Sequence, residues 1–241
     1  MPPKKAETGF AFQAEMLYIP AVKTKNARTF TDADHRSELQ KLMVNTLFSE
    51  GFDQNLSYLI TDPESGNTAL VDPCGMVLEQ LEALGKLPVH LRYILLTHGH
   101  EDHFDALSAV FARCGHAPVV AHPLHPLHPD LPAADQAELP FGRSAIKVHH
   151  TPGHSRDSVV FEYAAERALF TGDTLFVDCI GFCRSRRKMA ASLRHLRELP
   201  DDLTVYPGHD YGCVPCRTLG EEKRLNPEFS PAFISRLDTA E

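Results

Sequence analysis

The stretch LLTHGHEDHFDAL, residues 95–107, holds three histidines, one glutamate and two aspartates within eight positions, directly after an apolar run. That apolar run is typical of a short strand buried on both faces. His98 and His100 alternate after it, so both side chains can project the same way from an extended segment. Asp102 and His103 fall where the next helix is expected to begin, and aspartate is common there for helix capping alone. The stretch is therefore either half of a metal site or a strand end followed by a capped helix.

Three further candidate ligands decide between these interpretations. They are His154 in TPGHS, Asp173 in TGDT and His209 in YPGHD, and each follows a β-rich run and a glycine. A glycine lets the backbone turn sharply and display the next side chain at the edge of a sheet. Four strand ends can therefore deliver seven ligands to one place. Imidazoles and carboxylates without thiolates suit zinc, iron or manganese, so the set predicts a metal site.

The composition is that of an ordinary soluble protein. The chain has 241 residues, of which 43% are hydrophobic, enough for a substantial core. Its net charge of −8, from 24 basic and 32 acidic residues, argues against a nucleic-acid-binding surface. No apolar stretch approaches the ~18 residues that span a bilayer, and no secretory signal is evident. Because its six cysteines are then expected to be reduced, we predict a cytoplasmic protein without membrane or nucleic-acid partners.

The order of the expected elements predicts an α/β fold with a mixed sheet or two stacked sheets. Residues 1–45 are expected to form an extension that packs on a single domain, residues 46–241. The proline-rich stretch 123–142 predicts a long surface loop, with His125 and His128 exposed to solvent rather than bordering a substrate cleft. Strands are expected at 56–61, 68–72, 92–97, 118–122, 145–150, 158–163, 168–172 and 203–207, and helices at 32–43, 75–86, 104–115 and 188–199.

The motifs THGHEDH, TPGHS, TGDTLF and YPGHDYG together resemble the metallo-β-lactamase superfamily over roughly residues 45–228. The resemblance implies an αββα sandwich of two mixed β-sheets flanked by helices, with two divalent metal ions at one edge. Zinc is the expected metal, with iron or manganese as the alternatives. One ion would be held by His98, His100 and His154 and the other by Asp102, His103 and His209, with Asp173 bridging the two.

Within that superfamily the motifs look most like the glyoxalase II-like, or hydroxyacylglutathione hydrolase-like, subgroup. This likeness implies a hydrolase that cleaves a thioester or related acyl ester of a small molecule such as a glutathione conjugate. Two adjacent divalent ions lower the pKa of a shared water, so a metal-bound hydroxide can attack the carbonyl. Asp102 is then the catalytic residue that passes a proton to the leaving group. No GxSxG motif is present, so no serine nucleophile is expected.

The ending YPGHDYG…TLGEEKRLNPEF, residues 206–229, looks more like single-domain relatives that include persulfide dioxygenases. The relatives of that kind bind one Fe(II) through two histidines and an aspartate, here His98, His154 and Asp173. The ligands therefore leave a dinuclear hydrolase and a mononuclear dioxygenase open, and a lactonase on the same fold is a further alternative. A non-catalytic binding protein would have little reason to keep seven ligand positions. The sequence gives no prediction of oligomeric state.

One departure from the family concerns the expected substrate contacts. Phe182 stands where the resemblance implies an arginine, and Arg184 follows two residues later in a basic cluster, residues 184–188. Such a cluster suits an anionic substrate, although a solvated helix flank is the alternative. We predict that Arg184, Arg186 and Tyr211 contact the substrate.

Two cysteine pairs follow the third and fourth ligand turns. They are Cys179 with Cys183, and Cys213 with Cys216. If the pairs meet beside the site, their thiolates could hold an auxiliary metal ion or form a redox pair. Unrelated reduced cysteines in loops are the alternative.

Overall fold

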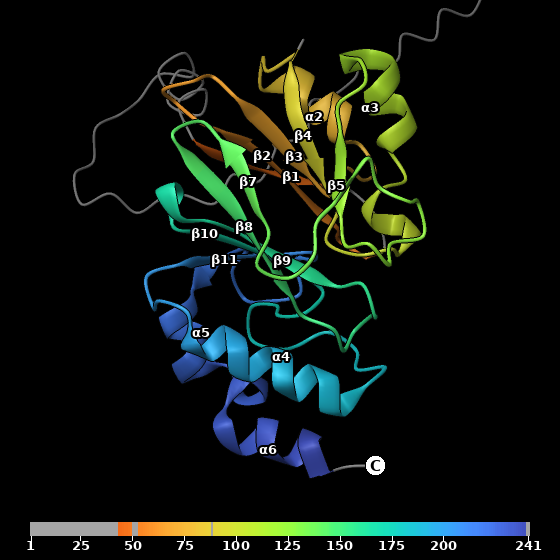
Figure 1. The fold of residues 1–241 in the computed structure, drawn as a ribbon. Helices are drawn as coiled ribbons and strands as arrows, with labels where there is room; N and C mark the ends of the chain where they lie inside the picture. The colour runs from red at the N-terminus through yellow and green to blue at the C-terminus, as the bar shows by residue number, and fades with distance from the viewer. Residues whose placement is uncertain (1–42, 50–52, 88, 240–241) are drawn as a thin grey trace, which may run out of the picture.

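Two six-stranded sheets form the centre of the fold, and helices cover the outer face of each sheet (Figure 1). The computed structural model describes residues 43–49, 53–87 and 89–239. The first sheet has the strand order β1-β2-β3-β4-β5-β6, and the second has the order β12-β11-β10-β9-β8-β7. Both sheets are mixed, with parallel and antiparallel neighbours. The predicted αββα sandwich is confirmed.

The elements match most of the predicted ones. The first sheet contains β1 (Val44–Phe48), β2 (Leu56–Thr61), β3 (Thr68–Val71), β4 (Leu91–Leu95), β5 (Val119–Ala121) and β6 (Leu131–Pro132). The second contains β7 (Glu138–Phe141), β8 (Ser144–His150), β9 (Val159–Tyr163), β10 (Ala168–Gly172), β11 (Thr204–Pro207) and β12 (Arg217–Thr218). The helices are α2 (Val77–Ala83), α3 (Leu107–Cys114), α4 (Arg186–Glu198), α5 (Leu219–Leu225) and α6 (Pro231–Thr239).

Apolar residues that alternate along the strands hold these layers together. In β2, Tyr58 and Ile60 belong to the cluster between the two sheets, whereas Leu59 points into the layer under α2 and α3. Because both faces of the strand are buried, the run LSYLIT is apolar without the alternation of a half-exposed strand. On the opposite side, Met189 and Leu193 of α4 pack on the second sheet.

The directions of the strands bring the ligand-bearing turns to one edge. β10 is parallel to β11, and β8 and β10 are both antiparallel to β9, so β8, β10 and β11 end at the same side of the second sheet. β4 of the first sheet ends beside them, because the Val159 amide donates to the Thr97 carbonyl at 2.8 Å. The Gly208 amide likewise donates to the Gly172 carbonyl at 3.0 Å. The four strand ends are thus linked through the backbone.

Most of the proline-rich stretch consists of turns and irregular loop, as predicted. It also contains β6 and β7, which are the outermost strands of their sheets, and prolines are tolerated in edge strands. His125 is not exposed, although it was predicted to be. It is 1% exposed, with its Nε2 3.1 Å from the His98 carbonyl, and its Nδ1 accepts from the Leu127 amide. His128 is exposed, as predicted.

Other differences lie at the ends of elements and of the chain. Asp102 and His103 lie in a 3₁₀ turn, Glu101–His103, because α3 begins only at Leu107. β1, β12, α5 and α6 were not predicted. The predicted helix at 32–43 lies almost wholly outside the described residues, and β1 begins two residues before the predicted domain boundary. That residues 1–45 pack on a single domain stays a prediction.

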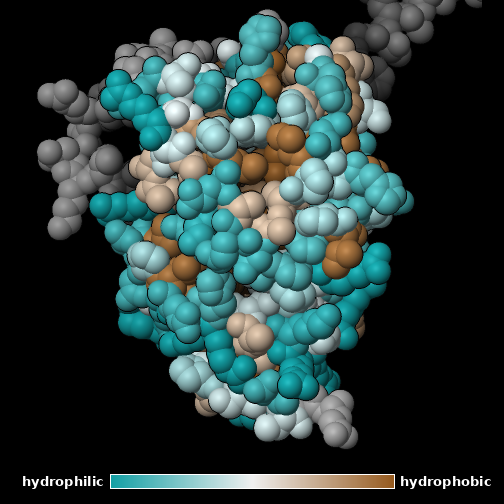
Figure 2. Space-filling view, in the orientation of Figure 1, coloured by the Kyte–Doolittle hydropathy of each residue, from teal (hydrophilic) through white to brown (hydrophobic). Residues whose placement is uncertain are grey.

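The surface in the orientation of Figure 1 is mostly hydrophilic, with small separate hydrophobic patches (Figure 2). Among the helices of the described residues, none is long and apolar enough to cross a membrane.

We expect the Tyr58→Phe variant to be less stable, because one hydroxyl links the two sheets beneath the ligand turns. Tyr58 in β2 is buried and donates to the Pro207 carbonyl at the end of β11 at 2.6 Å. The variant keeps the ring packing but leaves that buried carbonyl without this donor, which costs about 1–3 kcal/mol of unfolding free energy. Urea denaturation measures the loss. Tyr93→Phe is the matched control, because its 3.2 Å bond to the Pro140 carbonyl is only part-buried; equal losses in both variants would contradict the argument.

Candidate metal centre

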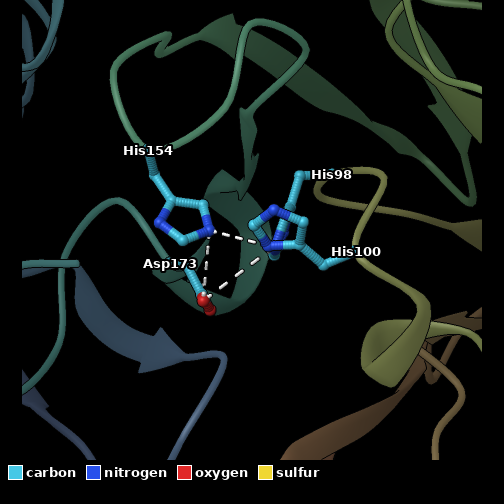
Figure 3. A group of neighbouring side chains, drawn as sticks. All are labelled: His98, His100, His154 and Asp173. Carbon is cyan, nitrogen blue, oxygen red and sulfur yellow. Dashed lines mark hydrogen bonds and ion pairs between the residues drawn. The ribbon is translucent and has the colours of Figure 1, made fainter. Parts of the chain in front are cut away.

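Four side chains from three turns meet at this edge and point toward one another (Figure 3). His98 and His100 follow β4, His154 follows β8, and Asp173 follows β10. One ligand atom of each lies within 4.8 Å of those of the other three. His100 Nδ1 is 2.9 Å from both His98 Nε2 and His154 Nε2, and Asp173 Oδ2 is 3.5 Å from His154 Nε2.

A second group lies next to the first. It contains Asp102, His103 and His209, again with ligand atoms within 4.8 Å of one another. His103 Nε2 is 3.3 Å from His209 Nε2, and Asp102 Oδ2 is 3.6 Å and 3.7 Å from these two nitrogens. Asp173 Oδ1 faces this group, 3.3 Å from His103 Nε2 and 3.5 Å from His209 Nε2. The Asp173 carboxylate therefore points one oxygen toward each group.

The chemistry of these donors fits divalent metal ions. Asp173 Oδ1 is buried and has no hydrogen-bond partner among the described residues. A buried polar atom without a partner costs about 1–3 kcal/mol, and more when it is charged. A cation between Asp173 and the imidazoles removes that cost. Imidazole nitrogens and carboxylate oxygens are also ligands that zinc, iron and manganese accept.

The electrostatics of the site favour the metal-binding protonation state of His98, His154 and Asp173. They do not favour that of His103 or His209, whose pKa values are raised. Burial lowers the pKa of His98 and of His154, so both imidazoles are neutral. Burial by itself would raise the pKa of Asp173, but the charge of the neighbouring His103 outweighs burial and holds that pKa well below its usual range. Burial opposes charge on His103 as well, yet Asp173 and Asp72 raise its pKa. A metal ion that binds there must displace the proton that His103 holds.

The ring nitrogens that face away from the groups are also bonded, and such contacts fix the orientation of a ligand. The partners are Thr97 Oγ1 for His98 at 3.1 Å, Asp72 Oδ2 for His103 at 3.0 Å, the Phe182 carbonyl for His154 at 3.1 Å and the Asp53 carbonyl for His209 at 2.6 Å.

Two positioning residues were missed by the sequence analysis. Asp72 follows β3 with a positive φ of 45° and is buried. It accepts from the Thr97 amide at 2.8 Å and from the Thr97 hydroxyl at 2.6 Å, besides its contact with His103. Asn55 donates through Nδ2 to Asp102 Oδ2 at 2.9 Å. An aspartate that closes the apolar run TALV is a sequence signal that could have pointed to Asp72.

The glycines in the ligand turns have two different roles. Gly172 has a φ of +46°, so it provides the sharp turn that the sequence predicted. Gly208 instead provides space, because a Cβ there would lie 2.4 Å from Asp173 Oδ1 and 2.8 Å from His103 Cε1.

The predicted substrate contacts separate into two groups. Arg184 reaches the site, with Nη2 3.3 Å from His100 Nε2, and the Tyr211 ring stacks on His209 with centroids 4.8 Å apart. Arg186 begins α4 and is exposed, and it does not line the cavity beside His100. Phe182, where the resemblance implies an arginine, is 78% exposed.

The cysteine pairs do not join a ligand group. All six cysteines are free, and neither group of candidate ligands in the described part of the chain contains one. Burial raises the pKa of Cys179, Cys183 and Cys216, which disfavours their thiolates. Cys213 Sγ accepts from Arg217 at 2.9 Å. The predicted auxiliary metal site thus gains no support, and a redox role stays a prediction.

Comparison with known proteins identifies the family. A model of the metallo-beta-lactamase superfamily matches residues 51–209, which include all seven ligand positions. The chain belongs to the metallo-beta-lactamase superfamily. Membership of this superfamily, together with the two ligand groups, implies that the chain binds divalent metal.

Two kinds of relative stand out within the superfamily. The chain is 37% identical over 163 residues to a hydroxyacylglutathione hydrolase of a Bradyrhizobium species. The matched region covers 65% of this chain and 63% of the relative. It is 31% identical over 183 residues to the human (Homo sapiens) persulfide dioxygenase ETHE1, covering 72% and 71%. The crystal structure of ETHE1 from Myxococcus xanthus has a TM-score of 0.71 and 31% identity, covering 82% of this chain and 90% of that one. The chain spans less than two thirds of the hydroxyacylglutathione hydrolase.

We expect Asp72→Asn to weaken metal binding by about 10- to 100-fold, the usual effect of losing a carboxylate behind a ligating histidine. The amide replaces an acceptor that fixes Thr97 and His103 with a group that also donates. Competition with a chelator of known affinity, with elemental analysis of the same sample, measures the change. Asp105→Asn is the matched control, because that aspartate accepts from the Gly75 amide outside the ligand groups. Equal affinities in wild type and Asp72→Asn would contradict the positioning role.

Proposed function

We propose that the chain is a hydrolase that uses two divalent metal ions, with zinc favoured, to cleave thioesters of the hydroxyacylglutathione class. The Asp173 carboxylate is the observation that carries this proposal, because its two oxygens face two separate ligand groups. The likeness to hydroxyacylglutathione hydrolases supports the substrate class. A cytoplasmic location, consistent with six free cysteines, belongs to the same proposal.

The chain's own residues define how the substrate approaches. When bound, the ions supply Lewis acidity, which lowers the pKa of a water and polarises the thioester carbonyl. His98, His103 and Asp173 are buried, whereas the Asp102 side chain is 42% exposed. The substrate therefore enters over Asp102. One wall of the entrance is formed by Tyr211, which is half exposed and stacked on His209.

Asp102 is the residue best placed to move a proton. Asn55 holds its Oδ2 at 2.9 Å, so the carboxylate keeps one orientation at the open side of the site. From there it can accept the proton that the attacking water gives up and pass it to the sulfur that leaves when the thioester carbon–sulfur bond breaks. Among the described residues, the two ligand groups contain one other acidic residue, Asp173, and that residue is buried.

A persulfide dioxygenase is the second candidate. It is favoured by the relative ETHE1, of which the chain covers 71%. That activity would need one iron, held by His98, His154 and Asp173, which lie together in the first group.

We expect the protein, purified without added metal or chelator, to contain about two metal ions per chain. It should hydrolyse S-lactoylglutathione, and Asp173→Asn should lower both metal content and activity because it removes the shared ligand. Elemental analysis and a thiol-release assay on one sample measure the two quantities. Asp202→Asn, an exposed aspartate paired with Arg167, is the control. About one iron per chain, with oxygen uptake in the presence of glutathione persulfide and no thiol release, would instead favour the dioxygenase.

Asp102→Asn is expected to lower kcat by about 100-fold or more, the usual size of a general-acid contribution. The loss should grow as the pKa of the leaving thiol rises, because a poorer leaving group depends more on protonation. A series of thioesters with thiols of different pKa tests this, with metal content measured on the same protein. The neighbouring exposed Glu101→Gln is the matched control. A loss that is the same for every leaving group would show that Asp102 acts only as a ligand.

A further inference from the structure

A cavity of about 350 Å³ opens beside His100, next to the first ligand group. Gly99 lies in its wall, where a Cβ would come within 2.4 Å of Pro126 Cδ and 2.9 Å of Asp157 Oδ2. A side chain at this turn would therefore collide with two residues of the cavity wall, Pro126 and Asp157. Its charged walls carry both signs, from Arg156, Asp157, Arg184 and Lys188.

Asp157 is an unusual residue in such a wall. It is only 5% exposed, and its Oδ1 accepts from the Ser155 hydroxyl at 2.7 Å. Its Oδ2 is buried without a hydrogen-bond partner among the described residues. No described residue forms an ion pair with this carboxylate. The free oxygen therefore calls for a donor from a ligand.

The three basic side chains are available on the same wall. Arg156, Arg184 and Lys188 are exposed, and none forms an ion pair with another described residue. Among the described residues, the one hydrogen-bond partner of Arg184 is His100 Nε2, at 3.3 Å. A guanidinium has five N–H donors, so Arg184 keeps donors that can face a ligand.

We propose that this cavity binds the α-amino acid end of the substrate, with its ammonium on Asp157 and its carboxylate on Arg184, Arg156 and Lys188. A ligand with only negative charge would leave the Asp157 oxygen without a donor, and one with only positive charge would face three cations. A zwitterion satisfies both signs. The inference rests on the proposed function, because the γ-glutamyl end of a glutathione thioester is such a group, and the cavity borders His100.

Binding of S-methylglutathione to the metal-loaded protein tests this without any turnover. Its blocked sulfur cannot bind metal as a thiolate, and its N-acetylated form lacks only the ammonium. By calorimetry we expect the free amine to bind at least about tenfold more tightly to the wild type, and less than about twofold more tightly to Asp157→Asn. The control Asp202→Asn should keep the wild-type ratio. Equal affinities in the wild type, or an unchanged ratio in Asp157→Asn, would overturn the proposal.

The proposed contacts to the ligand's carboxylate are tested by a separate experiment. S-methylglutathione with its γ-glutamyl α-carboxylate converted to the amide should bind more weakly to the wild type, and Arg184→Gln should remove most of that difference. This experiment holds even if Asp157→Asn fails to fold, which thermal unfolding would reveal. If selective binding is found without thioester hydrolysis, the proposed function is wrong, but the proposed binding of an amino acid group in the cavity is supported. Hydrolysis without selectivity for the amino acid end overturns only the inference drawn here.

Discussion

A carboxylate buried between two groups of imidazoles is the constraint on which the rest of the site depends. Asp173 is 8% exposed, and without a cation its Oδ1 has no partner among the described residues. It follows β10, so the strands that carry its neighbours must end at the same edge. The parallel directions of β8, β10 and β11 meet that requirement in the second sheet, and β4 meets it from the first.

A second buried carboxylate, Asp72, connects the ligand-bearing segment to the first sheet. Asp72 follows β3 and contacts both Thr97, directly before the first histidine of the segment, and His103, its last histidine. One side chain thus fixes the two ends of the segment that gives ligands to both groups. Tyr58 links the sheets behind it through the Pro207 carbonyl, one residue before Gly208. The spacing of the two ligand groups is therefore set by the packing of the sandwich rather than by loops.

Three of the candidate ligands, His154, Asp173 and His209, could be picked out from the sequence because each follows a β-rich run and a glycine. Asn55 could not be found in this way, because it acts on Asp102 at a separation of 47 residues. His125 was misplaced for the same reason: its burial depends on the His98 carbonyl, 27 residues away. The prolines of β6 and β7 argued against strands in the sequence analysis, but edge strands tolerate proline. For α5 a local signal was present and overlooked, since Thr218 and Glu221 form a capping box.

The second ligand group bears on the choice between the two reactions. A mononuclear dioxygenase would need only His98, His154 and Asp173, which lie in the first group. Yet every member of the second group is held by a contact of its own: Asn55 on Asp102, Asp72 on His103, and the Asp53 carbonyl on His209. Buried polar groups are costly to arrange unless their partners are in place. The second group is thus held by contacts as complete as those of the first, and these contacts support the proposal that both positions hold a metal ion.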